Sequence, residues 1–405
     1  MRKLIIKPDM MQTAAICIVV LFIGKWIKGK VDFFEKFCIP APVIGGFLFA
    51  IIHLFLREFG ILEFQMDVTF QDPFMMFFFT SIGLIASIDI IKKGGVGVII
   101  FYIATVILVF LQNGVGIGIA KFLGEDSLLG LLCGSITMVG GHGTAGVWGP
   151  EFVKNGFVGA NEIGMAAATF GLIMGSLIGG PIGGRLIKKN NLAPSVLDKE
   201  ENIRYKEEEL INTVVEEINV NEILKTMAVI FVSIAIGVIL KNELLKLWQK
   251  LILPAYVTSM LIAGIYRNTI GRKGTFKVNE RCANLLGDIG LNMFLAMALT
   301  NLKLWQLAEV AGPMIIILLV QTLIIVLYTT FVTFNIMGRD YDAAVLSAGM
   351  CGFGMGATAN GVANMSSVVE KYGPAPKAFF ILPIVGAFLI DLTNTFAITF
   401  FASLF

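Results

Sequence analysis

Long, uninterrupted apolar runs restrict the possible folds of this chain more than any other feature. The segments 96–120 and 311–334 contain no charged residue, and both exceed the roughly 20 residues that a helix needs to cross the hydrocarbon core of a bilayer. Only 15% of all residues are charged, against roughly a quarter in soluble domains. The sequence therefore predicts an all-α polytopic protein embedded in the lipid bilayer.

The apolar segments predict about ten transmembrane helices. They are expected at 10–27, 38–56, 73–91, 96–120, 160–187, 223–240, 251–266, 285–302, 311–334 and 378–403. Two further segments, 127–149 and 343–366, are apolar but rich in Gly, Ser, Thr and Asn. Backbone that is not helical at membrane depth needs protein or water to satisfy its polar groups, so these segments are expected to form re-entrant hairpins.

The two halves of the chain resemble each other at an offset near 214 residues. Gly24 aligns with Gly237, and Pro40 aligns with Pro254. The motif GGHGTA, which begins at Gly140, aligns with GMGATA in the second half. Each half then holds five helices and one hairpin, and because five is odd the second half must enter the membrane from the opposite face. The sequence therefore predicts two inverted repeats, an architecture found in many secondary transporters.

The domain organisation and the topology follow from this repeat. Repeat 1 is expected to span 1–190, a cytoplasmic linker 191–222, and repeat 2 residues 223–405. With the N-terminus outside, about two thirds of the 31 lysines and arginines fall on the inner side, as the positive-inside rule requires. Both termini are then expected outside, with the first hairpin entering from the outer face and the second from the inner face.

The glycine-rich centres of the two hairpins are the strongest candidates for a binding site. Glycine lets backbone groups approach a ligand closely, and helix N-termini at membrane depth suit a carboxylate. Threonine hydroxyls and exposed carbonyl groups suit a hard cation such as sodium. The alternative is that these glycines only permit close helix packing, which is the preferred explanation for 168–184, Gly114 and Gly118.

Three ionisable residues in apolar segments are further candidates. Asp391 lies within a predicted helix, where a charge is costly and marks a position for a substrate ammonium or a sodium ion, unless a neighbouring helix merely satisfies it. Glu162 lies near a predicted helix end, where a functional and a structural role are equally open. His142 is expected to hydrogen-bond at the hairpin tip, because no His or Cys spacing supports a transition-metal site.

Enzyme motifs give little support to a catalytic function. The chain contains no HExxH, GxSxG or Walker A motif, so it is not expected to be an enzyme, and transport would draw on an ion gradient. A membrane enzyme based on His142 and Glu162 would lack an orienting partner in the sequence. A channel would need a continuous polar pore, which the few charged residues in these helices do not favour.

At the residues discussed above, the sequence resembles the bacterial sodium/glutamate symporter family. The segments GSITMVGGHGT, ATFGLIMGSLIGGP, CGFGMGATANGVANM and GPAPKAFFILPIVGAFLID are similar to its signature regions. The resemblance covers nearly the whole chain. It implies sodium-coupled uptake of L-glutamate through the bacterial inner membrane, by a homodimer in which a substrate-carrying core moves like an elevator against a fixed scaffold. Sodium is then the coupling ion, and neither an organic cofactor nor a nucleic acid is expected.

The hairpin argument and the resemblance together select the site residues. The expected substrate ligands are Gly140, Gly141, His142, Gly143, Thr144, Gly354, Gly356, Thr358, Asn360, Asn364 and Asp391. The expected ion ligands are Thr137, Thr144, Thr358 and Asp391. The chain departs from the family pattern at Ala359, Asn360 and Gly361, where Pro-Thr-Ala is usual. Another anionic amino acid or a dicarboxylate, carried with sodium or protons, is therefore the alternative substrate.

Overall fold

The computed structural model describes residues 4–36, 39–86, 95–194, 218–247, 253–272, 277–306 and 311–404. Within these ranges, seven helices are long and apolar enough to cross a membrane: Met10–Lys28, Ala41–Glu58, Gly95–Phe122, Ala160–Lys189, Val220–Leu247, Glu280–Thr300 and Ala311–Ile336. These helices agree with the predicted polytopic, largely helical membrane protein. Most of the predicted linker 191–222 lies outside the described residues.

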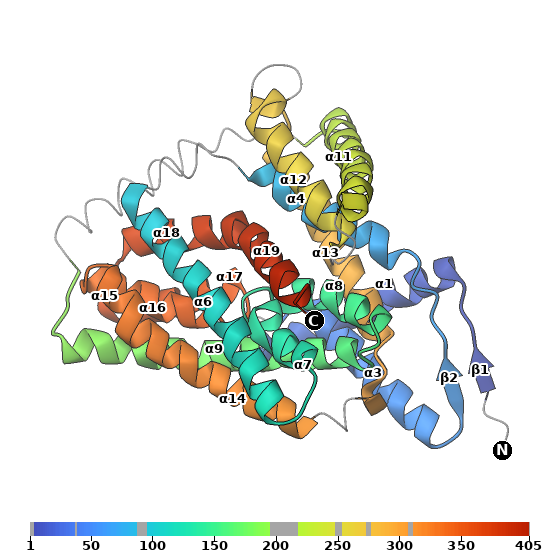
Figure 1. The fold of residues 1–405 in the computed structure, drawn as a ribbon, viewed down its shortest axis with the longest axis horizontal. Helices are drawn as coiled ribbons and strands as arrows, with labels where there is room; N and C mark the ends of the chain where they lie inside the picture. The colour runs from blue at the N-terminus through green and yellow to red at the C-terminus, as the bar shows by residue number, and fades with distance from the viewer. Residues whose placement is uncertain are drawn as a thin grey trace.

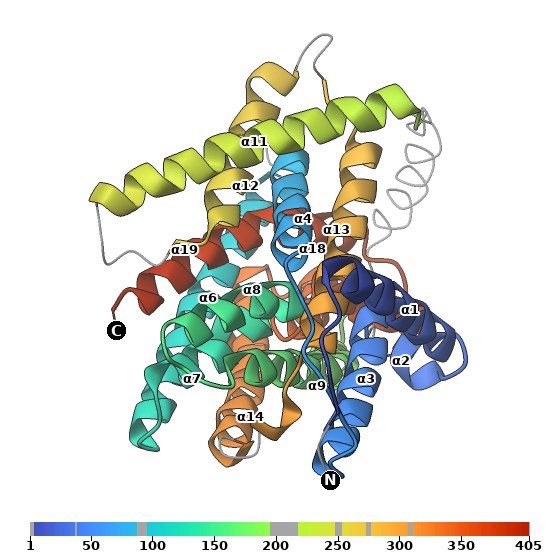
Figure 2. The same cartoon turned by 90° about the vertical axis from the view of Figure 1, so that its right-hand side faces the viewer.

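Three helices from each half of the chain pack together, and we call them the triplet group. They are α1 (Met10–Lys28), α3 (Ala41–Glu58) and α4 (Gln71–Ile85) from the first half, and α11 (Val220–Leu247), α12 (Ala255–Asn268) and α13 (Glu280–Thr300) from the second. Helix α13 packs against α4, α3 and α1, while α12 packs against α4 and α11. Figure 2 shows α11, α12, α4 and α13 together on one side of the molecule.

The remaining helices form a second set, the hairpin group. The first half contributes α6 (Gly95–Phe122), α7 (Ser127–Leu131), the π-helical turn η1 (Leu132–Ile136), α8 (Gly141–Lys154) and α9 (Ala160–Lys189). The second half contributes α14 (Ala311–Tyr328), η5 (Thr329–Thr333), α15 (Phe334–Ile336), α16 (Tyr341–Phe353), α17 (Thr358–Tyr372), α18 (Pro376–Ile384), η6 (Val385–Leu389) and α19 (Ile390–Ala402). Contacts between the groups run mainly from α13 to α8, α4 to η6 and α12 to α19.

Positions 214 residues apart in the sequence have the same local role in the two halves. Asp126 caps the start of α7 through a bond from Leu128 N at 2.8 Å, and Asp340 caps the start of α16 through a bond from Ala343 N at 2.7 Å. Such side-chain caps satisfy N–H groups that the first helical turn leaves unpaired. The two segments predicted as hairpins therefore begin in the same way.

The aligned residues of the triplet group also match. Pro40 is the N-cap of α3 with φ −63° and ψ 141°, and Pro254 is the N-cap of α12 with φ −62° and ψ 146°. A side chain at Gly24 would collide with the carbonyl oxygen of Ala41, and a side chain at Gly237 would collide with the backbone of the residue equivalent in α12, Ser259. Both glycines let the first two helices of a half approach closely.

The close packing predicted for the glycines of 168–184 is confirmed. Side chains at Gly171 and Gly179 would collide with the carbonyl oxygen of Met355 and the amide of Asn364, so α9 lies directly against the second broken segment. The same prediction for Gly114 and Gly118 is wrong, because an added Cβ at either would have no neighbour within 4 Å. Both lie on the outward side of α6, and the tight contact there is made by Gly116 against Gly130.

Short elements outside the long helices depart from an all-α fold. Two strands, β1 (Leu4–Ile6) and β2 (Leu62–Phe64), pair in parallel beside the N-terminus (Figure 1). The ring of His53 accepts a hydrogen bond from Phe64 N at 3.0 Å and so ties β2 to α3. The remaining short helices are α2 (Asp32–Lys36), η2 (Ile270–Arg272) and η4 (Leu304–Gln306).

Candidate functional site

The first predicted hairpin is a helix that breaks and restarts. The arm formed by α7 and η1 is interrupted at Gly134, whose φ of −89° and ψ of −141° are not helical. The chain then turns, and α8 begins at Gly141. The glycine-rich motif is therefore less irregular than its composition suggests, because all of it after Gly140 belongs to α8.

The second predicted hairpin has the same organisation. Helix α16 ends at Phe353, four residues form a turn, and α17 begins at Thr358. The carbonyl oxygen of Gly354 in this turn accepts a hydrogen bond from Gln112 Nε2 of α6 at 2.8 Å. This bond satisfies a carbonyl group that the end of α16 would otherwise leave unpaired.

The two turns touch each other. Gly141 has a φ of +57°, a left-handed conformation that favours glycine, and a side chain there would collide with the carbonyl oxygen of Gly356. Two segments separated by about half of the chain therefore meet through bare backbone. This close approach explains why glycine stands at the first position of α8.

A cavity of about 230 Å³ lies where the two turns meet. It is lined by Pro40, Phe78, Phe79, Val139, Gly140, Gly141, His142, Gly143, Thr144, Leu172, Leu291, Leu295, Phe353, Gly356, Ala357, Thr358, Ala359, Gly386 and Asp391. These residues come from both groups of helices. The volume suits a small solute, because sites for drug-sized ligands occupy roughly 300–1,000 Å³.

Two helix N-termini open onto this cavity without side-chain caps. The N-cap of α8 is Gly140 and the N-cap of α17 is Ala357, and neither provides a side-chain acceptor for the first N–H groups. Uncapped N–H groups and the partial positive charge of a helix N-terminus bind anions. No Lys or Arg lines the cavity, so these two helix ends are its sources of positive potential.

Asp391, in the first turn of α19, supplies the only carboxylate that lines the cavity. Its side chain forms no hydrogen bond or ion pair with the residues that the structure describes, and is therefore free to interact with a cation. The hydroxyl of Tyr256 lies nearby, where it accepts a bond from Trp148 Nε1 at 3.1 Å and bonds to the side chain of Thr395.

The hydrogen bonds of His142 define its tautomer. Its Nε2 lies 2.9 Å from Thr169 Oγ1, and the Thr169 hydroxyl donates its single proton to the carbonyl oxygen of Met165 at 2.9 Å. Nε2 must therefore carry the proton and donate to Thr169. This arrangement leaves Nδ1 as a hydrogen-bond acceptor, and it agrees with a hydrogen-bonding role at the hairpin tip.

The structure brings together most of the predicted substrate residues but leaves out three. Gly354 faces Gln112 rather than the cavity. Asn360 and Asn364 are buried against α9, where their Nδ2 atoms donate to the carbonyl oxygens of Leu172 and Gly175, each at 2.9 Å. The two amides thus join α17 to α9, and their prediction as direct substrate ligands is not supported by this geometry.

Three of the four predicted ion ligands also reach the cavity. Thr144 and Thr358 line it together with Asp391, and the Thr358 hydroxyl donates to the carbonyl oxygen of Gly386 at 2.9 Å. Thr137 is fully buried away from the cavity, and its hydroxyl donates to the carbonyl oxygen of Leu132 at 2.7 Å. Its position at the break of the first hairpin gives it a local structural role.

Glu162 has a structural partner. Its side chain is 3% exposed and accepts a hydrogen bond from Lys303 N at 2.7 Å, which anchors the segment after α13 to the start of α9. Of the two roles that the sequence left open, the structure supports the structural one.

Several residues that line the cavity were missed by the sequence analysis. Phe78 and Phe79 come from α4, and Leu291 and Leu295 come from α13. Apolar side chains within apolar helices carry no sequence signal of their own. Only the packing of α4 and α13 beside the hairpin tips reveals that they form the apolar wall of the cavity.

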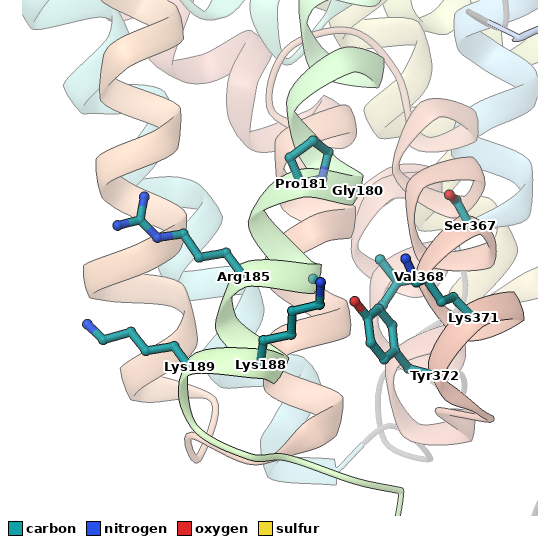
Figure 3. A pocket seen from close by; sticks show the side chains of 10 residues that line it. Gly180, Pro181, Arg185, Lys188, Lys189, Ser367, Val368, Lys371 and Tyr372 are labelled. Carbon is teal, nitrogen blue, oxygen red and sulfur yellow. The ribbon is translucent and has the colours of Figure 1, made fainter.

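A second cavity, of about 770 Å³, lies between the C-terminal ends of α9 and α17 (Figure 3). Its basic residues, Arg185, Lys188, Lys189 and Lys371, are all exposed and form no ion pair with a described residue. Figure 3 shows Arg185 and Lys189 extending away from Tyr372, which faces the cavity. This cavity contains neither hairpin tip, so we regard it as a basic surface hollow rather than the principal site.

No group of three or more His, Cys, Asp or Glu residues is positioned to hold a metal ion within the described ranges. The cavity at the hairpin tips instead offers neutral oxygen atoms and one carboxylate. Such a set suits an alkali cation better than a transition metal.

Comparisons with known proteins agree over nearly the whole chain. The family model described as sodium/glutamate symporter matches residues 6–374. The chain is 41% identical over 397 residues to the sodium/glutamate symporter of Escherichia coli K12, a match that covers 98% of each chain. It is 38% identical over 392 residues to the sodium/glutamate symporter of Haemophilus influenzae, covering 95% of this chain and 94% of that relative.

Proposed function

The chain belongs to the sodium/glutamate symporter family, and from this membership we propose that it is a secondary active transporter that couples L-glutamate uptake to a sodium gradient. The observation that carries the proposal is the cavity at the hairpin tips. Two uncapped helix N-termini and one carboxylate surround it, and glutamate carries two carboxylates and one ammonium group.

The two carboxylates of glutamate would each bind at one helix N-terminus. The backbone N–H groups from Gly141 to Gly143 would bind one, and those at the start of α17, near Thr358, would bind the other. Asp391 would pair with the ammonium group, and His142 Nδ1 offers it a further acceptor. Deep burial makes each of these polar contacts stronger than it would be in water.

The proposed architecture is a pair of inverted repeats of five membrane spans, each with a re-entrant hairpin. The matching caps at Asp126 and Asp340 and at Pro40 and Pro254 support an internal repeat. The odd number of spans in each half then requires opposite orientations. Helices α4 and α12 have only 15 and 14 residues and are shorter than a typical span, so the packed triplet group would support them.

The proposed mechanism is an elevator movement of the hairpin group against the triplet group. The limited contacts between the two groups support a sliding interface, and the cavity is walled by both. Bound sodium would neutralise buried oxygens and order the hairpins, so that the fully loaded and the empty carrier cross while a half-loaded carrier is held back. The family resemblance further suggests a homodimer in the bacterial inner membrane, with both termini outside.

Uptake into proteoliposomes tests the proposed function. The purified protein should accumulate labelled L-glutamate when sodium is present outside only, and should not do so when potassium replaces sodium. Equal rates under the two conditions would contradict sodium coupling. A conductance far above the turnover of a carrier would instead indicate a channel.

A second candidate function keeps the mechanism and changes the substrate. Ala359 lines the cavity, and Ala359, Asn360 and Gly361 depart from the family pattern. A carrier of another anionic amino acid or of a dicarboxylate would fit the same two helix N-termini. Competition of unlabelled aspartate, glutamine and malate against labelled glutamate distinguishes these substrates, because only a recognised compound will reduce uptake.

A further inference from the structure

Two buried oxygen atoms without partners lie at the break of the first hairpin, outside the substrate cavity. They are Ser135 Oγ on η1 and Asn394 Oδ1 on α19, and neither has a hydrogen-bond partner. The residues are 0% and 1% exposed. Buried polar atoms are nearly always paired, so two unpaired oxygens at one contact indicate that a ligand supplies the missing interaction.

The two residues are in direct contact. Asn394 Nδ2 donates to the carbonyl oxygen of Ser135 at 3.1 Å, which fixes the amide so that Oδ1 is the atom left over. Ser135 itself is held by its N–H, which donates to Asn113 Oδ1 of α6 at 2.8 Å. Three helices thus position the site, and Figure 1 shows α19 and α6 beside the first hairpin.

The electrostatic setting favours a cation. Ser135 lies at the C-terminal end of the arm 127–136, where helix carbonyl groups carry partial negative charge, and the non-helical backbone of Gly134 interrupts their bonding. Asp391 stands one helical turn before Asn394 on α19, and α19 contains no basic residue. Broken helices whose carbonyls and C-terminal ends line a cavity are suited to binding sodium ions.

The known alternatives fit less well. An anion would face partial negative charge from the helix end and a nearby carboxylate. A transition metal would lack the His, Cys or carboxylate ligands it prefers. A hydroxyl and an amide oxygen are hard, neutral ligands that suit an alkali cation.

We propose that Ser135 Oγ and Asn394 Oδ1 are ligands of a sodium ion bound at the C-terminal side of the hairpin break. This inference rests on the proposed sodium-coupled function and assigns the ion to residues other than Thr137, Thr144 and Thr358. The same break would then serve both solutes, because the arm that ends there attracts the cation and the arm that begins there attracts the carboxylate. Binding of sodium would fix the position of α8 relative to α19 and so prepare the substrate cavity.

Ser135→Ala is a clean test, because the hydroxyl that it removes makes no hydrogen bond. A purely structural serine predicts an unchanged or slightly higher melting temperature, since an unpaired buried polar atom is removed. A sodium ligand predicts a rise of about tenfold in the sodium concentration that gives half-maximal uptake, with glutamate affinity retained at saturating sodium. Ser176→Ala is the matched control, because Ser176 also has an unpaired buried hydroxyl, on α9, and it should leave the sodium dependence unchanged.

Two measurements separate this inference from the proposed function. The first is the sodium dependence of glutamate uptake, and the second is the increase in melting temperature of the detergent-purified protein on adding sodium in place of potassium, without glutamate. Absence of sodium-driven uptake by the wild type would reject the proposed function. Wild-type stabilisation by sodium that Ser135→Ala retains at the same concentration, or that Ser176→Ala weakens equally, would reject the site. If Ser135→Ala is not obtained folded, Ser135→Cys replaces the oxygen by a softer sulfur and must also weaken sodium binding.

Discussion

Asp391 shows how a single residue acquires a role from its surroundings. A carboxylate within an apolar helix is costly, and it is kept only where it meets a cation or hydrogen-bond donors. Here the carboxylate lines the cavity and makes no bond to the described part of the protein. Its natural partner is therefore a bound solute rather than a neighbouring helix.

Asp391→Asn should reduce sodium-driven glutamate uptake by roughly a hundredfold or more, because removing one partner of a buried charge pair costs about 2–5 kcal/mol. The fold should be retained, since no described hydrogen bond of the carboxylate is lost. Uptake and melting temperature are the two measurements. Asp288→Asn, on the exposed face of α13, is the control and should transport like the wild type. Coupled uptake by Asp391→Asn at the normal rate would remove this residue from the site.

Asn360 and Asn364 show the limit of residue-level prediction. Both follow the second glycine motif directly, and their amides could equally line a pocket or join helices. The structure directs both amides to carbonyl oxygens of α9. The sequence could not decide between the two roles, because the side of α17 on which α9 packs is set by contacts between distant segments.

At the scale of elements, the two broken helices depend on each other. Each leaves uncapped N–H groups at its second arm, and neither encloses the cavity alone. The contact of Gly141 with Gly356 fixes the distance between the two helix N-termini. The spacing of the two proposed carboxylate sites therefore depends on an absent side chain.

Gly141→Ala should disturb this contact. The left-handed backbone costs a residue with a Cβ roughly 1–2 kcal/mol, and the new methyl group must also displace the backbone of Gly356. We expect a lower melting temperature in detergent and the loss of most glutamate uptake. Gly114→Ala, on the open side of α6, is the control and should be neutral or slightly stabilising. Normal transport by Gly141→Ala would show that the turns need not meet so closely.

At the scale of the molecule, the helices divide in the same way in both halves. The first three helices of each half form the triplet group, and the later ones form the hairpin group. A division that repeats along the chain is what an internally duplicated carrier with a moving part would require. The cavity lies where the groups meet, so relative movement of the groups would change its access to either side.

Cysteine labelling tests the proposed inversion of the repeats. Phe122 and Ile336 end α6 and the α14–α15 helix, are 214 residues apart, and are 89% and 42% exposed. In a variant without the five native cysteines, Phe122→Cys should react with a membrane-impermeant maleimide in intact spheroplasts. Ile336→Cys should react only after the membrane is permeabilised. Labelling of both positions from the same side would rule out inverted repeats.

The sequence by itself determined the helical membrane class, the approximate position of each long helix and the two glycine-rich segments. It could do so because apolar length and local composition act within one segment and need no partner. The break positions, such as Gly134, and the helical state of the GGHGTA motif were less accessible, since both depend on tertiary contacts.

Only the tertiary structure decided which residues share the cavity. It brought Asp391 and both hairpin turns together, excluded Thr137, Asn360 and Asn364, and added the apolar walls of α4 and α13. It also revealed the contact between Ser135 and Asn394, two residues with no common motif. A binding site made from several helices is a property of their relative positions, and these are set by packing among residues far apart in the chain.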